Sequence, residues 1–168
     1  KGRACVVVGG GEVAERKAKA LVDHRAEVWV VSPRVTEELR RLVAEGAVRV
    51  ELRDYQEGDL EGAVLVIAAT DKPDLNARVS SEAQTLGILV NVVDDPEKST
   101  FIVPSSFNRG DVSIAISTGG RSPALAKKIR LILEESFPEE LASLAELLSE
   151  IRRELKSRGV TVEASAWQ

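Results

Sequence analysis

Three consecutive glycines, Gly9, Gly10 and Gly11, separate an apolar run from a run of helix-forming residues. The spacing Gly9-x-Gly11-x-x-Ala14 matches the dinucleotide-binding fingerprint with alanine in its third position. Gly9 would permit the tight turn, Gly11 would let the backbone approach a pyrophosphate, and Ala14 would let the helix sit against a sheet. Free N–H groups and the helix dipole would then receive the phosphates. The segment predicts a dinucleotide site, although a plain strand–turn–helix connection explains three glycines almost as well.

Polar residues follow two other apolar runs at the point where each run ends. Thr70 and Asp71 follow one run, and Asp94 and Asp95 follow the next. Asp71 is expected to cap a helix, with contact to a ligand as the alternative. A partly desolvated carboxylate at Asp94 could accept a proton from a carbon acid or pyrrole as a hydride leaves for a cofactor. A loop cap on the strand end explains Asp94 and Asp95 equally well.

The residues about twenty positions after the glycines bear on the choice between NAD and NADP. Dinucleotide sites often carry Asp or Glu here, but this sequence has Ser32-Pro33-Arg34. Ser32 can bond a ribose 2′-hydroxyl but cannot repel a 2′-phosphate, and Arg34 could attract one, so the choice stays open. The predicted cofactor-binding residues are Gly9, Gly10, Gly11, Glu12, Val13, Ser32, Pro33, Arg34, Thr70 and Asp71.

A second glycine-rich entry into a helix lies at Thr118-Gly119-Gly120-Arg121-Ser122-Pro123. Its backbone N–H groups suit an anionic ligand such as a carboxylate or a phosphate. Arg121, beside the glycines, is expected to contact that ligand. For Lys127, Lys128 and Arg130, which follow, a solvated basic helix face is an equal alternative.

Apolar periodicity predicts the elements that would position these residues. Strands are predicted at 4–8, 27–31, 48–52, 64–68 and 88–93. Helices are predicted at 12–23, 36–45 and 73–86. The alternation predicts an α/β fold, a Rossmann-like doubly wound parallel sheet with strand order 3-2-1-4-5. Ligands of such sheets bind beyond the carboxyl ends of the strands, so the polar segments that end strands one, four and five should face one crevice.

The alternation stops after Pro96. Residues 101–103 and 112–117 are predicted to form two strands joined by a turn at 107–110, and so small a hairpin should pair with something else, plausibly a second subunit. Helices are predicted from Ser122 to about Ser136 and from Pro138 to about Ser157, followed by a tail at 160–168 without a pattern. The predicted parts are a Rossmann domain over 1–98, a dimerisation segment over 99–121 and a C-terminal helical domain over 122–168.

Composition narrows the class of protein. Among 168 residues, 43% are hydrophobic and 30% are charged, as in soluble globular proteins. The net charge of −4 gives no reason to expect nucleic acid, and no apolar run approaches the ~20 residues that span a membrane. Cys5 and His24 are single residues of their kinds, which excludes a disulfide framework and predicts no metal site. These features predict a cytoplasmic protein.

Five segments in this order resemble one family. They are Gly9-Gly10-Gly11-Glu12-Val13-Ala14-Glu15-Arg16-Lys17, Ala68-Ala69-Thr70-Asp71, Asn91-Val92-Val93-Asp94-Asp95-Pro96, Phe101-Ile102-Val103-Pro104-Ser105 and Ser117-Thr118-Gly119-Gly120-Arg121-Ser122-Pro123. The sequence from Gly2 to about Arg153 is thereby similar to the precorrin-2 dehydrogenase family, which includes the N-terminal part of siroheme synthases.

The resemblance implies an NAD-dependent oxidation of precorrin-2 to sirohydrochlorin, with Asp94 as general base, and a homodimer in which the middle segment exchanges between subunits. Thr118 stands where relatives often carry serine. The substrate is a polycarboxylate macrocycle, which a cleft with basic residues would hold. No methyltransferase domain like that of some relatives is in this sequence, so precorrin-2 is expected from another protein. The predicted substrate-binding residues are Asn91, Arg109, Thr118, Gly119, Gly120, Arg121 and Lys127.

Two alternative functions differ in their requirements. Some relatives also insert Fe²⁺ into sirohydrochlorin, and Asp94 would then take part in chelation as well. The predicted crevice offers no His or Cys, although a tetrapyrrole supplies four nitrogens itself. A non-enzymatic nucleotide-sensing Rossmann domain would need neither Asp94 at a strand end nor the second glycine-rich turn.

Overall fold

The computed structural model describes residues 1–160, apart from the side chain of Leu141, so the predicted tail beyond residue 160 lies outside the described part. The chain divides into two compact units, of which the first spans Lys1–Val103 and the second begins at Pro104. The three-part division made from the sequence stays a prediction. None of the helices within residues 1–160 is long and apolar enough to cross a membrane.

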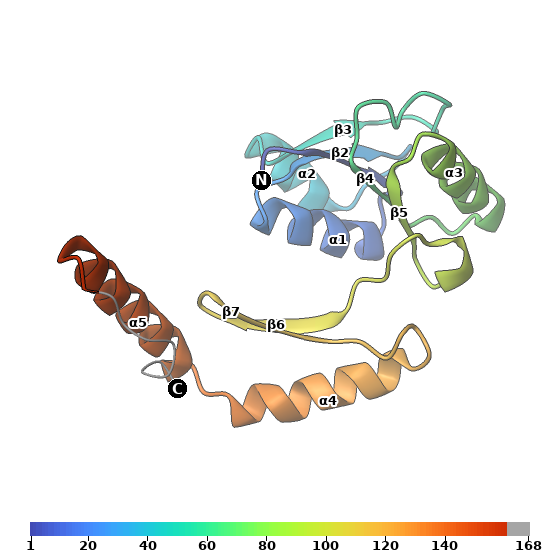
Figure 1. Cartoon of the computed structure of the whole chain (residues 1–168). Coiled ribbons are helices and arrows are strands. Elements are labelled where there is room, and N and C mark those ends of the chain that lie inside the picture. Colours follow the sequence, from blue (N-terminus) through green and yellow to red (C-terminus); the bar gives the residue numbers. More distant parts are fainter. Residues whose placement is uncertain (161–168) are drawn as a thin grey trace. The chain divides into compact units, whose positions relative to one another are not determined.

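The first unit is a five-stranded parallel sheet with helices on both faces (Figure 1). All four strand pairs are parallel and their order is β3-β2-β1-β4-β5, which confirms the predicted doubly wound fold. Each predicted strand and helix of this unit is present to within one or two residues. The elements are β1 (Ala4–Val8), α1 (Glu12–Asp23), β2 (Glu27–Val31), α2 (Glu37–Ala44), β3 (Val48–Glu51), β4 (Leu65–Ala68), α3 (Pro73–Thr85), β5 (Leu89–Val92) and the short 3₁₀ helix η1 (Pro96–Lys98).

Two hydrophobic clusters cover the two faces of the sheet. Side chains alternate along a strand, so Val6 and Val8 belong to one cluster and Val7 to the other. The cluster that contains Val7 is completed by Ala14 and Ala18 of α1 and by residues of α2. The opposite cluster is completed by α3 and by the connection between β3 and β4. The carboxyl ends of the strands are thereby held on a rigid edge.

The start of α3 differs from the prediction. The N-cap is Lys72 rather than Asp71, and no side chain of the N-cap residue makes a capping bond. The Thr70 hydroxyl instead accepts the Lys72 N–H at 3.2 Å and donates to Oδ1 of Asn76 at 2.7 Å. The predicted cap was wrong because this threonine–asparagine pair orders the connection, which leaves Asp71 exposed.

The second unit contains an antiparallel hairpin of β6 (Ser105–Arg109) and β7 (Val112–Ile116). Arg109 is paired with Val112, so the loop consists of Gly110 and Asp111 alone, with Gly110 at a φ of 56°. The predicted strand at 101–103 and turn at 107–110 were therefore wrong. Polar residues suggested a turn, whereas Ser106 and Asn108 form the exposed face of β6 and Phe107, on the opposite face, is its one buried residue.

Two helices follow the hairpin in the second unit, α4 (Pro123–Ser136) and α5 (Glu140–Ser157). Ser122 caps α4 as predicted, because its hydroxyl accepts the Leu125 N–H at 3.3 Å. Phe107 and Ala126 are the buried hydrophobic residues that the structure describes in this unit.

Candidate functional site

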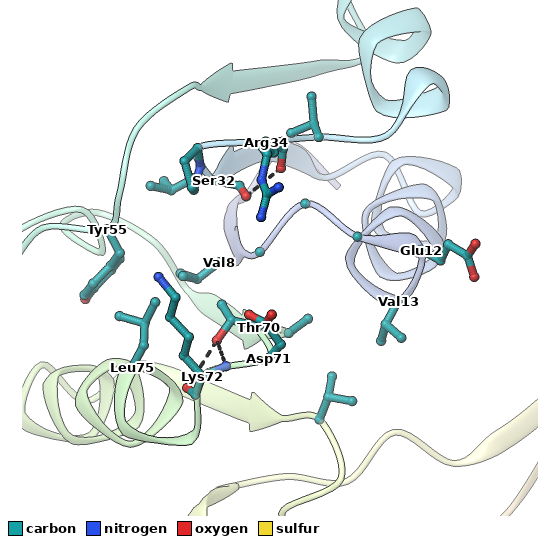
Figure 2. Close-up of a pocket in the computed structure, with 18 of the residues that line it drawn as sticks. Val8, Glu12, Val13, Ser32, Arg34, Tyr55, Thr70, Asp71, Lys72 and Leu75 are labelled. Carbon is teal, nitrogen blue, oxygen red and sulfur yellow. Dashed lines mark hydrogen bonds between the residues drawn. The ribbon is translucent and has the colours of Figure 1, made fainter.

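A cavity of about 810 Å³ opens in the first unit beyond the carboxyl ends of β1, β2 and β4. This is the edge at which doubly wound sheets bind ligands. Every predicted cofactor-binding residue and Asp94 line it, so the structure brings together segments that are far apart in the sequence (Figure 2). The further lining residues are Val8, Val31, Val35, Thr36, Asp54, Tyr55, Ala69, Lys72, Leu75 and Val93.

The three glycines of the turn meet different surroundings. Gly9 has a φ of 123°, and a Cβ there would lie 2.3 Å from the Ala69 carbonyl oxygen. A Cβ on Gly10 would lie 2.0 Å from the Arg34 carbonyl oxygen. A Cβ on Gly11 would meet nothing within 4 Å, and Gly11 is exposed to the cavity. The fold itself therefore requires Gly9 and Gly10, whereas the space at Gly11 is free for a ligand. The steric requirement at Gly10 was not predicted.

The N-terminus of α1 faces this space. Gly11 is the N-cap, with a φ of −82°, and supplies no side chain that could accept the first helical N–H groups. The N–H groups of Glu12 and Val13 have no acceptor within the helix. These unpaired donors, the open space at Gly11 and the cavity volume fit the diphosphate of a dinucleotide.

The end of β2 is tied to the glycine turn by backbone hydrogen bonds. The Gly9 N–H donates to the Val31 carbonyl at 3.0 Å, and the Thr36 N–H donates to the Gly10 carbonyl at 3.0 Å. The Ser32 side chain is buried and donates to the Arg34 carbonyl at 2.7 Å. The segment after β2 is thereby held against the turn at the position where dinucleotide sites contact the ribose.

The sequence left Asp94 and Asp95 with two possible roles, proton acceptor or loop cap, and the structure gives these two residues different surroundings. Asp95 is the loop cap, since its carboxylate accepts the Lys98 N–H at 3.2 Å and pairs with the Lys98 ammonium, which lowers the pKa of Asp95. Asp94 lines the cavity and has a φ of 60°, in the left-handed region. Asp94 is exposed because it stands where the chain turns out of the sheet. The predicted partial desolvation of its carboxylate was therefore wrong.

A lysine of α1 lies within electrostatic range of Asp94. Burial lowers the pKa of Lys17, the neighbouring charge of Arg16 lowers it further, and the charge of Asp94 acts in the opposite direction. Lys17 is one helical turn beyond Val13, which lines the cavity. The side of the site that carries Asp94 therefore includes a half-buried cation.

The predicted substrate-binding residues have other contacts. Asn91 is buried and donates to the Phe101 carbonyl at 3.1 Å, so it anchors the segment after β5 and does not line the cavity. Arg109 donates to the carbonyls of Phe137 and Glu134, each at 3.0 Å, and joins β6 to the end of α4. Their role in substrate binding stays a prediction, as it does for Thr118, Gly119, Gly120, Arg121 and Lys127 of the second unit.

Tyr55 is the wall residue that sequence reasoning missed most clearly. It lies in the irregular connection between β3 and β4, is buried, and donates its hydroxyl to Glu82 of α3. Glu82 also accepts the Gly58 N–H at 2.8 Å. Burial, followed by the contact with Glu82, raises the pKa of Tyr55 far above its usual range. The connection has no apolar periodicity that would predict its position. The available sign that Tyr55 is buried was that it is a single aromatic residue in a polar segment.

Comparisons with known proteins agree with this geometry. Residues 1–105 match a family described as "Putative NAD(P)-binding", and residues 109–136 match one described as "Sirohaem biosynthesis protein central". Siroheme synthase of Pseudomonas aeruginosa (strain LESB58) is 47% identical over 156 residues, which cover 93% of this chain and 34% of that protein. Siroheme synthase 1 of Aeromonas salmonicida (strain A449) is 42% identical over 153 residues, which cover 91% of this chain and 33% of that protein. The chain thus spans about a third of the length of these curated relatives.

A solved structure matches nearly the whole chain. The structure of SirC, a precorrin-2 dehydrogenase, superposes with a TM-score of 0.80 and is 31% identical in sequence. The match covers 99% of this chain and 81% of that chain.

Proposed function

The chain belongs to the precorrin-2 dehydrogenase family, and on this premise we propose that it oxidises precorrin-2 to sirohydrochlorin with NAD as acceptor. One observation carries the proposal: Asp94, at the end of β5, lines the same cavity as the glycine turn and the N-terminus of α1. A nucleotide-sensing domain would need the turn but would have no use for a carboxylate at this position.

The reaction removes one hydride and one proton from the macrocycle, which gives sirohydrochlorin, NADH and a released proton. When bound, NAD supplies the hydride acceptor. The open space at Gly11 and the first N–H groups of α1 would hold the diphosphate, and the segment after β2 would contact the ribose. The chain thereby supplies position rather than a reactive group on this side of the cavity.

Asp94 takes the proton. Its carboxylate is not occupied by the loop, because the neighbouring Asp95 serves as the cap of η1. The peptide bonds around it are held by the Val93 N–H donating to the Ala68 carbonyl at 3.0 Å and the Asp95 N–H donating to the Val92 carbonyl at 3.2 Å. A carboxylate on a fixed backbone at the cavity wall can act as a general base.

Homodimerisation is part of the proposal and is supported by the second unit. Phe107 and Ala126 are its buried hydrophobic residues among those described, whereas seven large apolar side chains of α4 and α5 are exposed. A unit with so small a core gains stability from a partner. The exposed residues are Leu125, Leu131, Ile132, Leu144, Leu147, Leu148 and Ile151.

The test of the function is formation of NADH that depends on precorrin-2, measured by absorbance with purified chain under anaerobic conditions. A second arm adds Fe²⁺, because relatives that insert iron would consume sirohydrochlorin. Within residues 1–160 no group of three or more His, Cys, Asp or Glu could hold a metal ion, whereas a tetrapyrrole supplies four nitrogens itself. A rate of insertion equal to the control without enzyme would end the chelatase alternative and leave the dehydrogenase untouched. The predicted cytoplasmic location rests on the sequence and stays a prediction.

A further inference from the structure

We propose that the dinucleotide cavity also accepts NADP, and that Arg34 binds its 2′-phosphate while Lys72 adds a second positive charge. The inference rests on the proposed function only in assuming that a nicotinamide dinucleotide occupies this cavity. It concerns the ribose end of the site and makes no use of Asp94 or of the tetrapyrrole.

The first step concerns the group that normally rejects NADP. Sites selective for NAD place Asp or Glu at the end of the second strand, where the carboxylate bonds the 2′-hydroxyl and repels a 2′-phosphate. Ser32 occupies this position, directly after β2 and beside the glycine turn. Its hydroxyl is buried and donates to the Arg34 carbonyl at 2.7 Å, so it carries no charge and its proton is engaged by the loop. Nothing at this position repels a phosphate.

Arg34 supplies the positive charge that sites for 2′-phosphates use. Its carbonyl oxygen is pinned by the Ser32 hydroxyl and packs against Gly10, so the backbone that carries the side chain is fixed. The side chain itself is exposed, and Figure 2 shows its guanidinium directed into the cavity. Among the ion pairs formed within residues 1–160, none involves Arg34. A planar guanidinium without a carboxylate partner suits a phosphate.

Lys72 approaches from the opposite wall. It stands at the start of α3, and Figure 2 shows its side chain extending across the cavity. Its ammonium lies 4.0 Å from a carboxylate oxygen of Asp54, but the two side chains are 64% and 76% exposed, so this pair is weak and easily exchanged for a phosphate. The acidic lining residues lie outside the segment after β2; they are Glu12, Asp54, Asp71 and Asp94.

Binding, measured without tetrapyrrole, tests the inference. Calorimetric titration of the full chain is expected to give a Kd for NADP no more than about threefold above that for NAD. Arg34→Glu is expected to raise the Kd for NADP by about tenfold to a hundredfold and the Kd for NAD by less than about threefold. The reason is that a charged hydrogen bond to the 2′-phosphate is lost and replaced by repulsion. The matched control is Arg40→Glu, which makes the same charge change on an exposed residue of α2 outside the cavity and should alter neither Kd.

Fragments without nicotinamide isolate the phosphate contribution. Adenosine 2′,5′-bisphosphate should bind wild-type chain at least as tightly as adenosine 5′-monophosphate, and this parity should be lost in Arg34→Glu. Lys72→Gln should weaken NADP by about twofold to fivefold at low salt and less at high salt, since its charge is exposed.

Two results would overturn the inference: binding of NAD that is tighter than that of NADP by more than about threefold in wild-type chain, or equal losses of affinity for both dinucleotides in Arg34→Glu. Failure of the proposed function looks different. If NADP binds through Arg34 but neither dinucleotide is reduced with precorrin-2, the 2′-phosphate site stands and the dehydrogenase falls. If precorrin-2 reduces NAD while NADP fails to bind, the dehydrogenase stands and this inference falls.

Discussion

Two adjacent aspartates illustrate how neighbouring residues of one type acquire separate roles. The carboxylate of Asp95 pairs with Lys98 and caps η1, whereas Asp94 has a left-handed backbone conformation and lines the cavity. Asparagine tolerates the left-handed region as aspartate does, so exchange of Asp for Asn at position 94 removes the charge with little backbone strain.

Asp94→Asn is expected to reduce turnover with precorrin-2 by about 10²–10⁴-fold, the usual contribution of a positioned general base. The Kd for NAD, measured by titration, should change by less than about threefold. Asp95→Asn is the matched control: it loses the ion pair with Lys98, which is solvent-exposed and contributes little to stability, and it should keep full turnover. Full turnover in Asp94→Asn would remove the residue from the chemistry.

Alanine should act mainly on stability at Gly10 and mainly on dinucleotide binding at Gly11. A Cβ at Gly10 meets the Arg34 carbonyl at 2.0 Å, so Gly10→Ala should lower the free energy of unfolding by roughly 1–3 kcal/mol. Gly11 has an ordinary φ and open space, so Gly11→Ala meets no clash and should cost only the small loss expected because alanine is a poorer N-cap than glycine, about 1 kcal/mol or less.

Urea unfolding and NAD titration of both variants check this pair. Gly11→Ala should raise the Kd for NAD by about tenfold or more, since its methyl group would occupy the space in which we expect the diphosphate to bind. Normal NAD affinity in a stable Gly11→Ala protein would show that the phosphates bind elsewhere.

At the scale of elements, sequence patterns sufficed where an element is defined by its own residues. The buried strands of the sheet, the glycine turn and the cap at Ser122 were all predictable from apolar runs and local hydrogen-bonding residues. Predictions failed where pairing decides the outcome. Strand β6 is polar along its exposed face and exists because it pairs with β7, and Asp71 lost the cap because Asn76 reaches back to Thr70.

Helices α1 and α2 are joined by an ion pair that should make stability depend on pH. The Glu38 carboxylate contacts Arg41 at 2.6 Å and Lys19 of α1 at 2.5 Å, and hydrogen bonds from Arg41 and then Lys19 lower the pKa of Glu38 from 4.5 to about 2. Because the folded pKa is the lower one, this contribution is present above pH 4.5 and is lost as the pH falls to about 2.

The expected result is that wild-type chain loses stability more steeply than Glu38→Gln between pH 4.5 and about pH 2, as measured by urea unfolding at a series of pH values. Glu37→Gln, which removes the same charge from the neighbouring exposed position, is the control and should retain the wild-type slope. Parallel curves for wild type and Glu38→Gln would mean that the pair contributes nothing.

At the scale of the whole molecule, the two units differ in how much apolar surface each one buries by itself. The first unit has two well-packed clusters and a complete dinucleotide cavity. The second unit leaves apolar side chains of α4 and α5 exposed. The clustering of the predicted cofactor-binding residues at one cavity could be predicted from sequence because they follow strands of the parallel sheet. The proposed tetrapyrrole contacts of the second unit stay predictions, because these residues follow no strand of the parallel sheet.

The proposed dimer gives a prediction at this scale. Leu147→Glu combined with Ile151→Glu places charges on the exposed apolar face of α5 and should convert a dimeric wild-type chain to monomer, as measured by light scattering after size-exclusion chromatography. Leu52→Glu, at an exposed leucine of the first unit, should leave the mass unchanged. A wild-type chain that is monomeric at micromolar concentration would refute the dimer.

The most direct test of the central claim is the stoichiometry of products when the full chain is incubated anaerobically with precorrin-2 and NAD. The account predicts one NADH for each sirohydrochlorin formed, with both products reduced together in Asp94→Asn while NAD binding persists. A chain that binds NAD but forms no more NADH or sirohydrochlorin than the control without enzyme would contradict it.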